Sequence, residues 1–148
     1  MRLFIKMKAT ETVIAHGHPL VRGTHPTTFE VTTEKELTRY GDCIIAVGAD
    51  KGAANLSSEF RNVISREGAS LTTRLVCRDI SVEVQSSGGK GITLEHPTDL
   101  VWRRSSFCCS RTIATGSDHV ARTLSRELIK YLQEGETIRV EMTAQCPD

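Results

Sequence analysis

Side chains that could move protons and hold an anion crowd one short segment of the chain, HGHPLVRGTHPTTFE at residues 16–30. Histidine titrates near neutral pH, so His18 and His25 are the candidates there for transferring a proton. The side chains of the segment that could bind a ligand carry a charge or a hydroxyl group: Arg22, Thr27, Thr28 and Glu30. Together they predict a site for a small anionic molecule, phosphorylated or nucleotide-like in character.

A metal ion is an alternative occupant of the same segment. His16 and His18 would lie on one face of a strand, because strand side chains alternate between faces with a period of two. Glu30 or His25 would supply the third ligand, as in a site of two histidines and one carboxylate. No HxxxH or CxxC spacing supports this metal site, so hydrogen bonding within an irregular, proline-containing loop is the simpler interpretation.

Two similar loops, GADK at residues 48–51 and GSDH at residues 116–119, offer a second candidate for ligand binding. Each is expected where a strand runs into a helix, and the N–H groups and dipole of a helix start favour an anion. The candidate residues are the last two of each loop: Asp50, Lys51, Asp118 and His119. The simpler interpretation is that each aspartate caps its helix, a contact that stabilises by about 1 kcal/mol.

Asp42 and Cys43 begin a short apolar run, GDCII at residues 41–45, which is typical of a buried strand. Cys43 would be a nucleophile if a histidine lay beside it in space, with Asp42 as a further catalytic candidate. A structural turn at Asp42 and a small buried thiol at Cys43 are the simpler interpretations. The chain has five cysteines and no CxxC pair, which favours reduced thiols in a cytoplasmic protein.

An aromatic and basic cluster, VWRRSSFCCSR at residues 101–111, offers a different class of function. Trp102 and the neighbouring arginines could stack on and clamp RNA, or dock a protein, in a non-catalytic binding module. The competing interpretation is that Trp102 packs in the core while the arginines face water. The formal net charge of +1 and the total of seven aromatic residues do not favour nucleic acid as the partner.

Hydrophobic periodicity predicts the elements that must position these residues. Apolar or alternating runs predict strands at residues 3–15, 27–32, 42–48, 70–77, 79–86, 96–104, 108–116 and 136–144. The first helix is predicted from a stripe at helical spacing: Ala53, Leu56, Phe60, Val63 and Ile64. The second is predicted from a matching stripe: Ala121, Leu124, Leu128, Tyr131 and Leu132. Gly68 and Gly135 are expected to end the two helices.

The chain contains an internal repeat. Residues 45–60 and 113–128 share eight of sixteen positions, where about one match is expected by chance, and HPT occurs at 25–27 and 96–98. Half-repeats of about 25–78 and 96–145 would be marginal alone and would bury their apolar faces against each other. The prediction is therefore one α+β domain spanning 1–148, with a pseudo-twofold repeat. Its mixed sheet would be curved or barrel-like, with two related helices packed on it.

The motifs also resemble a known family. The runs GHP–VR–TH–TT–E, LT–GDCII, ADK, V–R–S–F–C–RT and L–REL–L are similar to the archaeal family of uncharacterised proteins called domain of unknown function 371. The resemblance implies an archaeal, intracellular protein of one compact domain, and it implies no particular activity. This chain departs from the family pattern at Ser117-Asp118-His119, where the family tends to repeat ADK, and at Ser110, where it tends to have aspartate. The resemblance therefore does not extend to any function that requires a second lysine in the loop at residues 116–119.

These features predict a protein that binds a small anionic molecule where the 16–30 segment meets Asp42 and Lys51, with catalysis left open. The non-catalytic RNA- or protein-binding module around residues 102–111 is the alternative. No apolar stretch has the length of a membrane-spanning helix or the character of a signal-peptide core, so we expect no membrane partner. No motif in the sequence identifies a cofactor or an oligomeric state.

Overall fold

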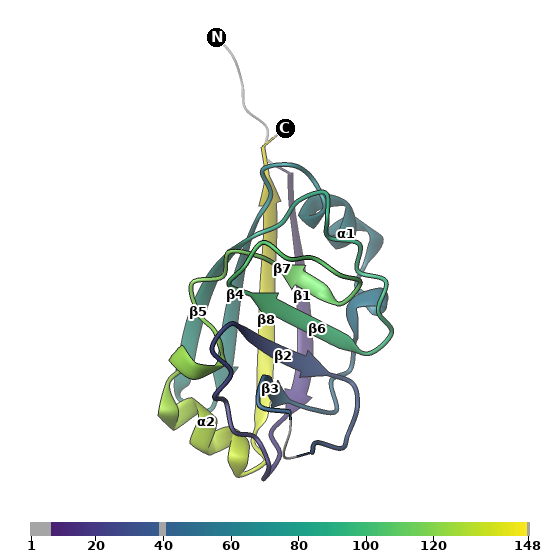
Figure 1. The fold of residues 1–148 in the computed structure, drawn as a ribbon. Coiled ribbons are helices and arrows are strands. Elements are labelled where there is room, and N and C mark those ends of the chain that lie inside the picture. The colour runs from purple at the N-terminus through teal and green to yellow at the C-terminus, as the bar shows by residue number, and fades with distance from the viewer. Residues whose placement is uncertain (1–6, 39–40, 148) are drawn as a thin grey trace.

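The computed structural model describes residues 7–38 and 41–147, and within them the strands form two sheets of four (Figure 1). In chain order the elements are β1 (Met7–His16), β2 (Thr28–Thr32), β3 (Ile44–Ala46), the 3-10 helix η1 (Ala53–Asn55), α1 (Ser58–Ile64), β4 (Ser70–Cys77), β5 (Ile80–Ser87), β6 (Asp99–Arg103), β7 (Thr112–Ala114), the 3-10 helix η2 (Ala121–Thr123), α2 (Arg126–Gln133) and β8 (Thr137–Cys146). The mixed α+β class predicted from the sequence is confirmed.

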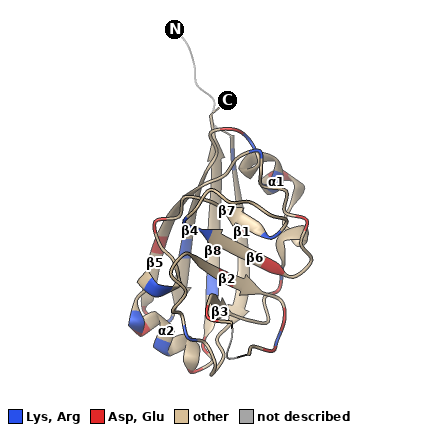
Figure 2. Ribbon diagram, viewed as in Figure 1, with Lys and Arg blue, Asp and Glu red and all other residues tan. Residues whose placement is uncertain are grey.

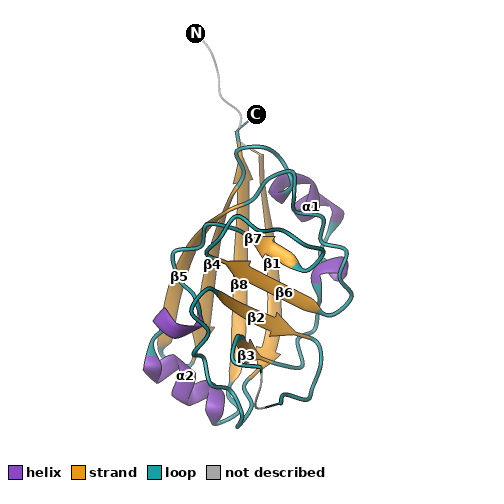
Figure 3. Ribbon diagram, viewed as in Figure 1, coloured by secondary structure: helices purple, strands orange, loops and turns teal. Residues whose placement is uncertain are grey.

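The first sheet has the order β1-β8-β4-β5, and all its neighbouring strands are antiparallel. Its strands bury every second residue, as β8 does with Ile138, Val140, Met142 and Ala144. This period of two puts one face of the sheet on the core and leaves the other face to solvent. The helix α1 packs against β1 and β8, and Figure 3 shows the two helices at different ends of the molecule.

The second sheet has the order β3-β2-β6-β7, with β2 and β6 antiparallel and each edge strand parallel to its neighbour. Directly opposite residues of an antiparallel pair share one face. Phe29 lies opposite Trp102, and their rings stack with centroids 4.7 Å apart. Trp102 Nε1 donates to Thr73 Oγ1 of β4 at 2.9 Å, so this face looks onto the first sheet. The opposite face of the second sheet is directed away from the first.

The two sheets meet at both edges through single bridges, His16 with Val47 and Ser87 with Thr115. Neither sheet is closed into a barrel. The expectation of one curved or barrel-like sheet is therefore corrected to two sheets, because one residue pair at each edge does not extend into a ladder. The buried apolar residues of both sheets and both α-helices nevertheless form one hydrophobic cluster.

Both α-helices are shorter than the apolar stripes predicted. Leu56 and Leu124 adopt extended backbone conformations with ψ near 150°, which separates a short 3-10 turn from each α-helix. The caps are serines: Ser57 Oγ accepts from the N–H of Phe60 at 3.1 Å, and Ser125 does the same for α2. The prediction that Asp50 and Asp118 cap the two helices is wrong, because α1 begins only at Ser58 and α2 only at Arg126.

The order β2-β3-η1-α1-β4 recurs after β5 as β6-β7-η2-α2-β8. This succession agrees with the element order expected of the two half-repeats, although an internal repeat itself stays a prediction. Within the described parts of the chain, no helix has both the length and the apolar character needed to cross a membrane.

Candidate functional site

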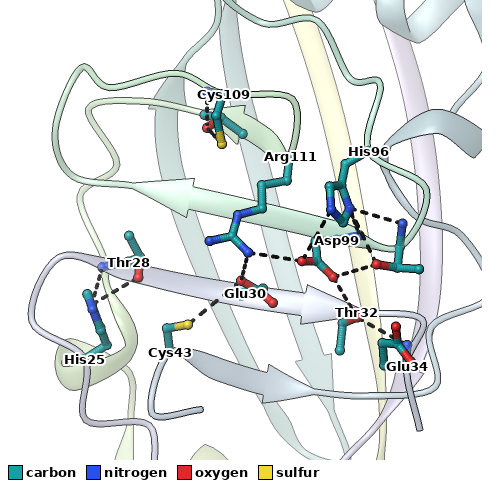
Figure 4. A network of polar contacts seen from close by, with 12 residues as sticks. His25, Thr28, Glu30, Thr32, Glu34, Cys43, His96, Asp99, Cys109 and Arg111 are labelled. Carbon is teal, nitrogen blue, oxygen red and sulfur yellow. Dashed lines mark hydrogen bonds and ion pairs between the residues drawn. The ribbon is translucent and has the colours of Figure 1, made fainter. Parts of the chain in front are cut away.

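The outward face of the second sheet carries a network of polar side chains centred on Glu30 (Figure 4). Glu30 lies in the middle of β2, opposite Val101 of β6, and is only 4% exposed. The sequence of β2, TFEVT, alternates apolar and polar residues. Packing of Phe29 and Val31 against the first sheet therefore forces Glu30 onto the opposite face. Its position follows from the core packing of its two neighbours.

Two loops bring a thiol and a guanidinium group beside this carboxyl. The N–H of Glu30 donates to the carbonyl of Cys43 at 2.9 Å, and the N–H of Val101 donates to that of Arg111 at 2.8 Å. These backbone contacts begin the parallel pairing of β3 and β7 with the central strands. Arg111 Nη1 lies 3.7 Å from Glu30 Oε1, and Cys43 Sγ donates to the same oxygen at 3.9 Å.

Asp99, the first residue of β6, supplies a second carboxylate to the network. Its Oδ2 lies 3.2 Å from Arg111 Nη1, and its Oδ1 accepts from the hydroxyls of Thr32 at 2.8 Å and Thr98 at 2.9 Å. His96 Nε2 is 4.0 Å from the same Oδ2. The Arg111 guanidinium thus bridges two carboxyl groups from neighbouring strands.

Glu30 is the group of this network best suited to proton transfer. Burial, reinforced by the Asp99 carboxylate and opposed by Arg111 and Arg103, raises the pKa of Glu30 to about 7. The cause is that a low-dielectric environment penalises the charged form of a carboxyl group. A carboxyl group with a pKa near physiological pH can both donate and accept a proton. The Arg111 side chain beside it is 43% exposed, so the network meets solvent there.

Two thiols near the network differ in acidity. Burial, together with the negative charges of Glu30 and Asp42, raises the pKa of Cys43 to about 11. Cys109 lies on the loop before β7, where partial burial opposes ionisation. Donors from the Arg111 backbone, the Thr112 hydroxyl and the Arg103 guanidinium outweigh it and lower the pKa of Cys109 to about 7. Cys43 is therefore a protonated thiol at neutral pH, and Cys109 titrates there.

The histidines of the 16–30 segment hold turns and strand ends. His25 Nδ1 accepts from the N–H groups of Thr27 and Thr28, both at 3.2 Å, and lies 3.0 Å from Thr28 Oγ1. His18 Nδ1 accepts from the N–H of Leu20 at 3.0 Å. A ring nitrogen that accepts a backbone N–H must be unprotonated, which leaves Nε2 to carry the proton of the neutral ring. Only Nε2 of each ring is then available for a ligand.

The GADK and GSDH loops each hydrogen-bond one edge strand of the first sheet, β1 or β5. Asp50 accepts from the N–H of Ile14 at 3.0 Å through Oδ1 and donates its own N–H to the Ile14 carbonyl at 2.9 Å. Asp118 makes the same two contacts with Gln85 of β5, at 2.9 and 3.0 Å. Each aspartate thus completes the hydrogen bonding of an edge strand.

Lys51 and His119, which follow these aspartates, also have local partners. Lys51 Nζ pairs with Glu11 Oε1 at 2.8 Å and donates to the Thr12 carbonyl at 3.0 Å. His119 Nδ1 lies 3.2 Å from Thr123 Oγ1 of η2. These contacts direct both side chains toward structural partners outside the Glu30 network.

The structure brings only part of the predicted set together. Of the predicted residues Cys43 contacts Glu30 directly; Thr28 hydrogen-bonds Cys43, and the N–H of His25 donates to the carbonyl of the neighbouring Asp42 at 3.3 Å. The predicted residues whose described contacts lie away from both Glu30 and Cys43 are His16, His18, Thr27, Asp50, Lys51, Asp118 and His119. Arg22 is exposed on the loop between β1 and β2.

The geometry does not support the metal alternative. His16 Nδ1 lies 3.3 Å from Thr137 Oγ1 at the end of β1, and the His18 ring folds back on its own loop. Glu30 is on the other sheet. Among the residues that the structure describes, no group of three or more His, Cys, Asp or Glu side chains could hold a metal ion.

Several network residues were not singled out from the sequence as site residues. They are His96, Asp99, Cys109 and Thr112. One signal for two of them was present: HPTD at 96–99 extends the HPT motif by an aspartate. His96 Nδ1 accepts from the N–H groups of Thr98 and Asp99, at 3.3 and 3.0 Å, and so fixes the strand start that presents Asp99. No local pattern distinguished Cys109 from Cys108.

A family model described as "Domain of unknown function (DUF371)" matches residues 13–145. The chain belongs to this family. It is also 36% identical, over 124 residues, to an uncharacterized protein of Methanocaldococcus jannaschii, an alignment that covers 84% of this chain and 91% of the relative. The whole Glu30 network lies inside the DUF371 match. Neither description names a ligand or a reaction, so function must be argued from the side chains.

In this DUF371 chain the ring of Trp102 is unavailable for stacking on bases. Trp102 is 0% exposed between the two sheets, where it stacks on Phe29. Arg103 and Arg111 are engaged with side chains of the network. The ribbon in Figure 2 shows basic and acidic residues on several elements of the described chain, with basic residues along α2. The aromatic part of the predicted nucleic-acid patch is thus a core residue.

A hollow elsewhere in the DUF371 fold lies at the ends of β4 and β8. Its volume is about 140 Å³, and it is lined by Gly68, Ser70, Gln145, Cys146 and Pro147. Its lining carries no charged side chain and none of the network residues. We therefore place the candidate site at the Glu30 network rather than at this hollow.

Proposed function

We propose that the outward face of the second sheet binds a small anionic molecule, and that Glu30 transfers a proton to or from it. The observation that carries the proposal is a buried carboxyl group with a pKa near 7 in contact with a half-exposed guanidinium group. Perturbed carboxyl groups beside a specific charge partner are concentrated at functional sites. This keeps the ligand class predicted from the sequence but moves its site from Lys51 to Arg111.

Arg111 is the group that would hold the anion. Its Nη1 is tied to Asp99 and Glu30, which fixes the orientation of the planar guanidinium, while the side chain remains 43% exposed. A preorganised arginine loses little side-chain entropy when it binds a carboxylate or phosphate in a bidentate manner. Lys51 is less suitable, because Glu11 and the Thr12 carbonyl already surround its ammonium group.

Glu30 would act as the acid or base of the site. An anion bound to Arg111 would lie close to Glu30 and would favour its neutral form, because like charges repel. Ligand binding and protonation of Glu30 are thus coupled. Affinity for an anion should then fall as pH rises through 7, where Glu30 of the free protein ionises. Cys43 and Thr28, which adjoin Glu30, would position the carboxyl group.

The test is a heteronuclear NMR titration with inorganic phosphate, a sugar phosphate, a nucleoside monophosphate and a dicarboxylate, following the backbone amides of Glu30, Val101 and Thr112. We expect at least one of these anions to shift the three amides at sub-millimolar to millimolar concentration. Arg111→Gln should weaken its affinity by about tenfold, which is the effect of losing one charge-assisted contact.

The matched control is Arg139→Gln, which removes an arginine that pairs with Glu141 on β8 of the first sheet. It should leave the affinity unchanged. The proposal is overturned if none of the four anions shifts these amides, or if both variants bind equally well. Native mass spectrometry of the purified protein would reveal an anion that remains bound through purification.

We also infer a pseudo-twofold repeat within one domain. What supports it is a set of matched contacts: His25 and His96 cap equivalent turns through Nδ1, and Asp50 and Asp118 fasten β1 and β5 with the same pair of hydrogen bonds. If the halves are one cooperative domain, urea unfolding should be a single transition at all probes. Two separate transitions would contradict this inference.

A further inference from the structure

A second group of reactive side chains lies at the rim of the Glu30 network, around the sulfur of Cys109. Arg103 Nη2 is 3.4 Å from Cys109 Sγ, and Thr112 Oγ1 is 3.7 Å from it. Arg103 Nε donates to Thr112 Oγ1 at 2.9 Å, and the N–H of Cys109 donates to that same oxygen at 3.0 Å. Thr112 is fully buried and holds both groups in place.

The positive charge of Arg103 has an unusual partner. No carboxylate among the described residues lies within ion-pairing distance, 4.0 Å, of the Arg103 guanidinium. Its close polar contacts are the Thr112 hydroxyl and the Cys109 sulfur. A part-buried cation stabilises nearby anions; Arg103 acts on the Glu30 carboxyl without pairing with it, whereas it is in direct contact with the Cys109 thiol. Charge balance therefore favours Cys109 as a thiolate.

An exposed aromatic ring also lies beside the arginine that contacts this sulfur. Phe107 is 60% exposed, more than any other large apolar side chain among the described residues, and Arg103 lies 5.0 Å from its ring centroid. An aromatic ring held over a guanidinium group at the surface offers an apolar wall next to a cation. Arg111 also lies two residues from Cys109, so a molecule entering here would meet two arginines.

We propose that Cys109 is a site of thiol–disulfide exchange for small anionic organic disulfides. The Cys109 thiolate attacks one sulfur of the disulfide in line with the S–S bond. A new bond forms between Cys109 Sγ and that sulfur, the original S–S bond breaks, and the second half leaves as a thiolate. One thiolate is consumed and one is released, so the step requires no external oxidant and no net proton transfer.

The other cysteines of the chain lack this surrounding. Cys43 donates to the Glu30 carboxylate oxygen, and burial with nearby negative charge keeps it protonated. Cys77 and Cys146 are buried in the core. Cys108 Sγ donates to the Ser106 carbonyl at 3.8 Å. These four thiols serve as internal references within one molecule.

The experiment measures the rate of mixed-disulfide formation at each cysteine of the folded protein, by peptide mass spectrometry after quenching with acid. The probes are oxidised glutathione, which is anionic, and cystamine, which is cationic. At pH 7 and low salt we expect Cys109 to react about a hundredfold faster than Cys43, since a larger thiolate fraction outweighs lower intrinsic nucleophilicity. Glutathione disulfide should react about tenfold faster than cystamine, and salt should reduce that difference.

Variants separate the role of Arg103 from a general charge effect. Arg103→Gln should slow Cys109 by about tenfold at pH 7 and move the midpoint of its pH–rate profile upward. Arg104→Gln changes the adjacent exposed arginine, which lacks a side-chain contact to Cys109, and should leave the midpoint in place. Cys108→Ser should still form the adduct at Cys109.

Two results would overturn the proposal. One is a Cys109 rate no greater than that of Cys43 in the wild-type protein, a measurement that does not depend on any variant folding. The other is equal reactivity toward the two probes at low salt. Neither result bears on the proposed anion site at Arg111, which is tested by non-covalent binding without a disulfide.

Discussion

The burial of Glu30 is the residue-scale feature with the clearest thermodynamic consequence. The folded protein removes this carboxyl from water, places it near Asp99, and compensates with one guanidinium group at 3.7 Å. Its pKa of about 7 in the folded state lies above the ordinary value of 4.5. The folded protein therefore holds the Glu30 proton more tightly than the unfolded chain does.

We expect this difference to make stability depend on pH. The contribution of protonated Glu30 is fully present below pH 4.5 and is lost as pH rises through about 7. The free energy of unfolding should fall between pH 5 and pH 8 by an amount on the order of 2 kcal/mol. Urea denaturation at the two pH values measures the loss. Glu30→Gln keeps the shape of the side chain without its charge, so the free energy of unfolding of this variant should depend less on pH. If it depends on pH as steeply as in the wild-type protein, other groups cause the dependence.

At the scale of elements, the loop after β3 and the cap of α1 have different structural roles, although the sequence predicted that Asp50 in this loop would cap the helix. Asp50 fastens β1 by bonding Ile14, while Ser57 begins the helix. A side-chain carboxylate that accepts a strand N–H replaces the carbonyl of a missing neighbouring strand. The aspartate is thus an edge-protecting residue of the first sheet.

Two substitutions separate these tasks. Ser57→Ala should lower the free energy of unfolding by about 1 kcal/mol, the usual effect of removing a helix cap. Asp50→Ala should leave the α1 amides protected but expose the Ile14 N–H. Hydrogen exchange followed by NMR distinguishes them: the Ile14 amide should exchange faster in Asp50→Ala and be unchanged in Ser57→Ala. Loss of protection in α1 upon changing Asp50 would restore the original helix-cap interpretation.

Hydrophobic periodicity predicted the positions of individual strands, but it did not predict which strands pair with each other. The run at 70–77 is β4, Ser70–Cys77, and the alternation at 27–32 contains β2. Local patterns report burial, but pairing joins β1 to β8 from opposite ends of the chain. The same limit applies to the site. Glu30, His25 and Cys43 became candidates from the sequence because they carry reactive groups, whereas the contact of Glu30 with Arg111 exists only through tertiary packing.

At the scale of the whole molecule, Trp102 connects the two sheets. Its ring stacks on Phe29 within the second sheet, and its indole N–H donates to Thr73 of the first. Thr73 is itself fully buried, so its hydroxyl has no water to replace a lost partner. The tryptophan is therefore part of the framework that holds the Glu30 face in position.

Trp102→Phe should lower the free energy of unfolding by about 1–3 kcal/mol, because it leaves the buried Thr73 hydroxyl with one partner fewer. In the wild-type protein, the fluorescence of this single tryptophan should be blue-shifted and poorly quenched by iodide. Addition of single-stranded RNA should not change its intensity. Strong quenching by RNA at low salt would instead favour the nucleic-acid-binding alternative.

The pairing of Glu30 with Val101 bears on how such a protein could have arisen. On the inferred repeat these two residues occupy the same place in the two halves, facing each other across the central antiparallel pair. A symmetric dimer of one half-length chain would set two glutamates, or two valines, against each other at this point. Two buried carboxyl groups directly opposite would repel, and two valines could not move a proton. If both halves are encoded in one gene, the two positions no longer have to carry the same residue, because each can mutate alone. One position can then hold a glutamate while the equivalent position in the other half holds a valine.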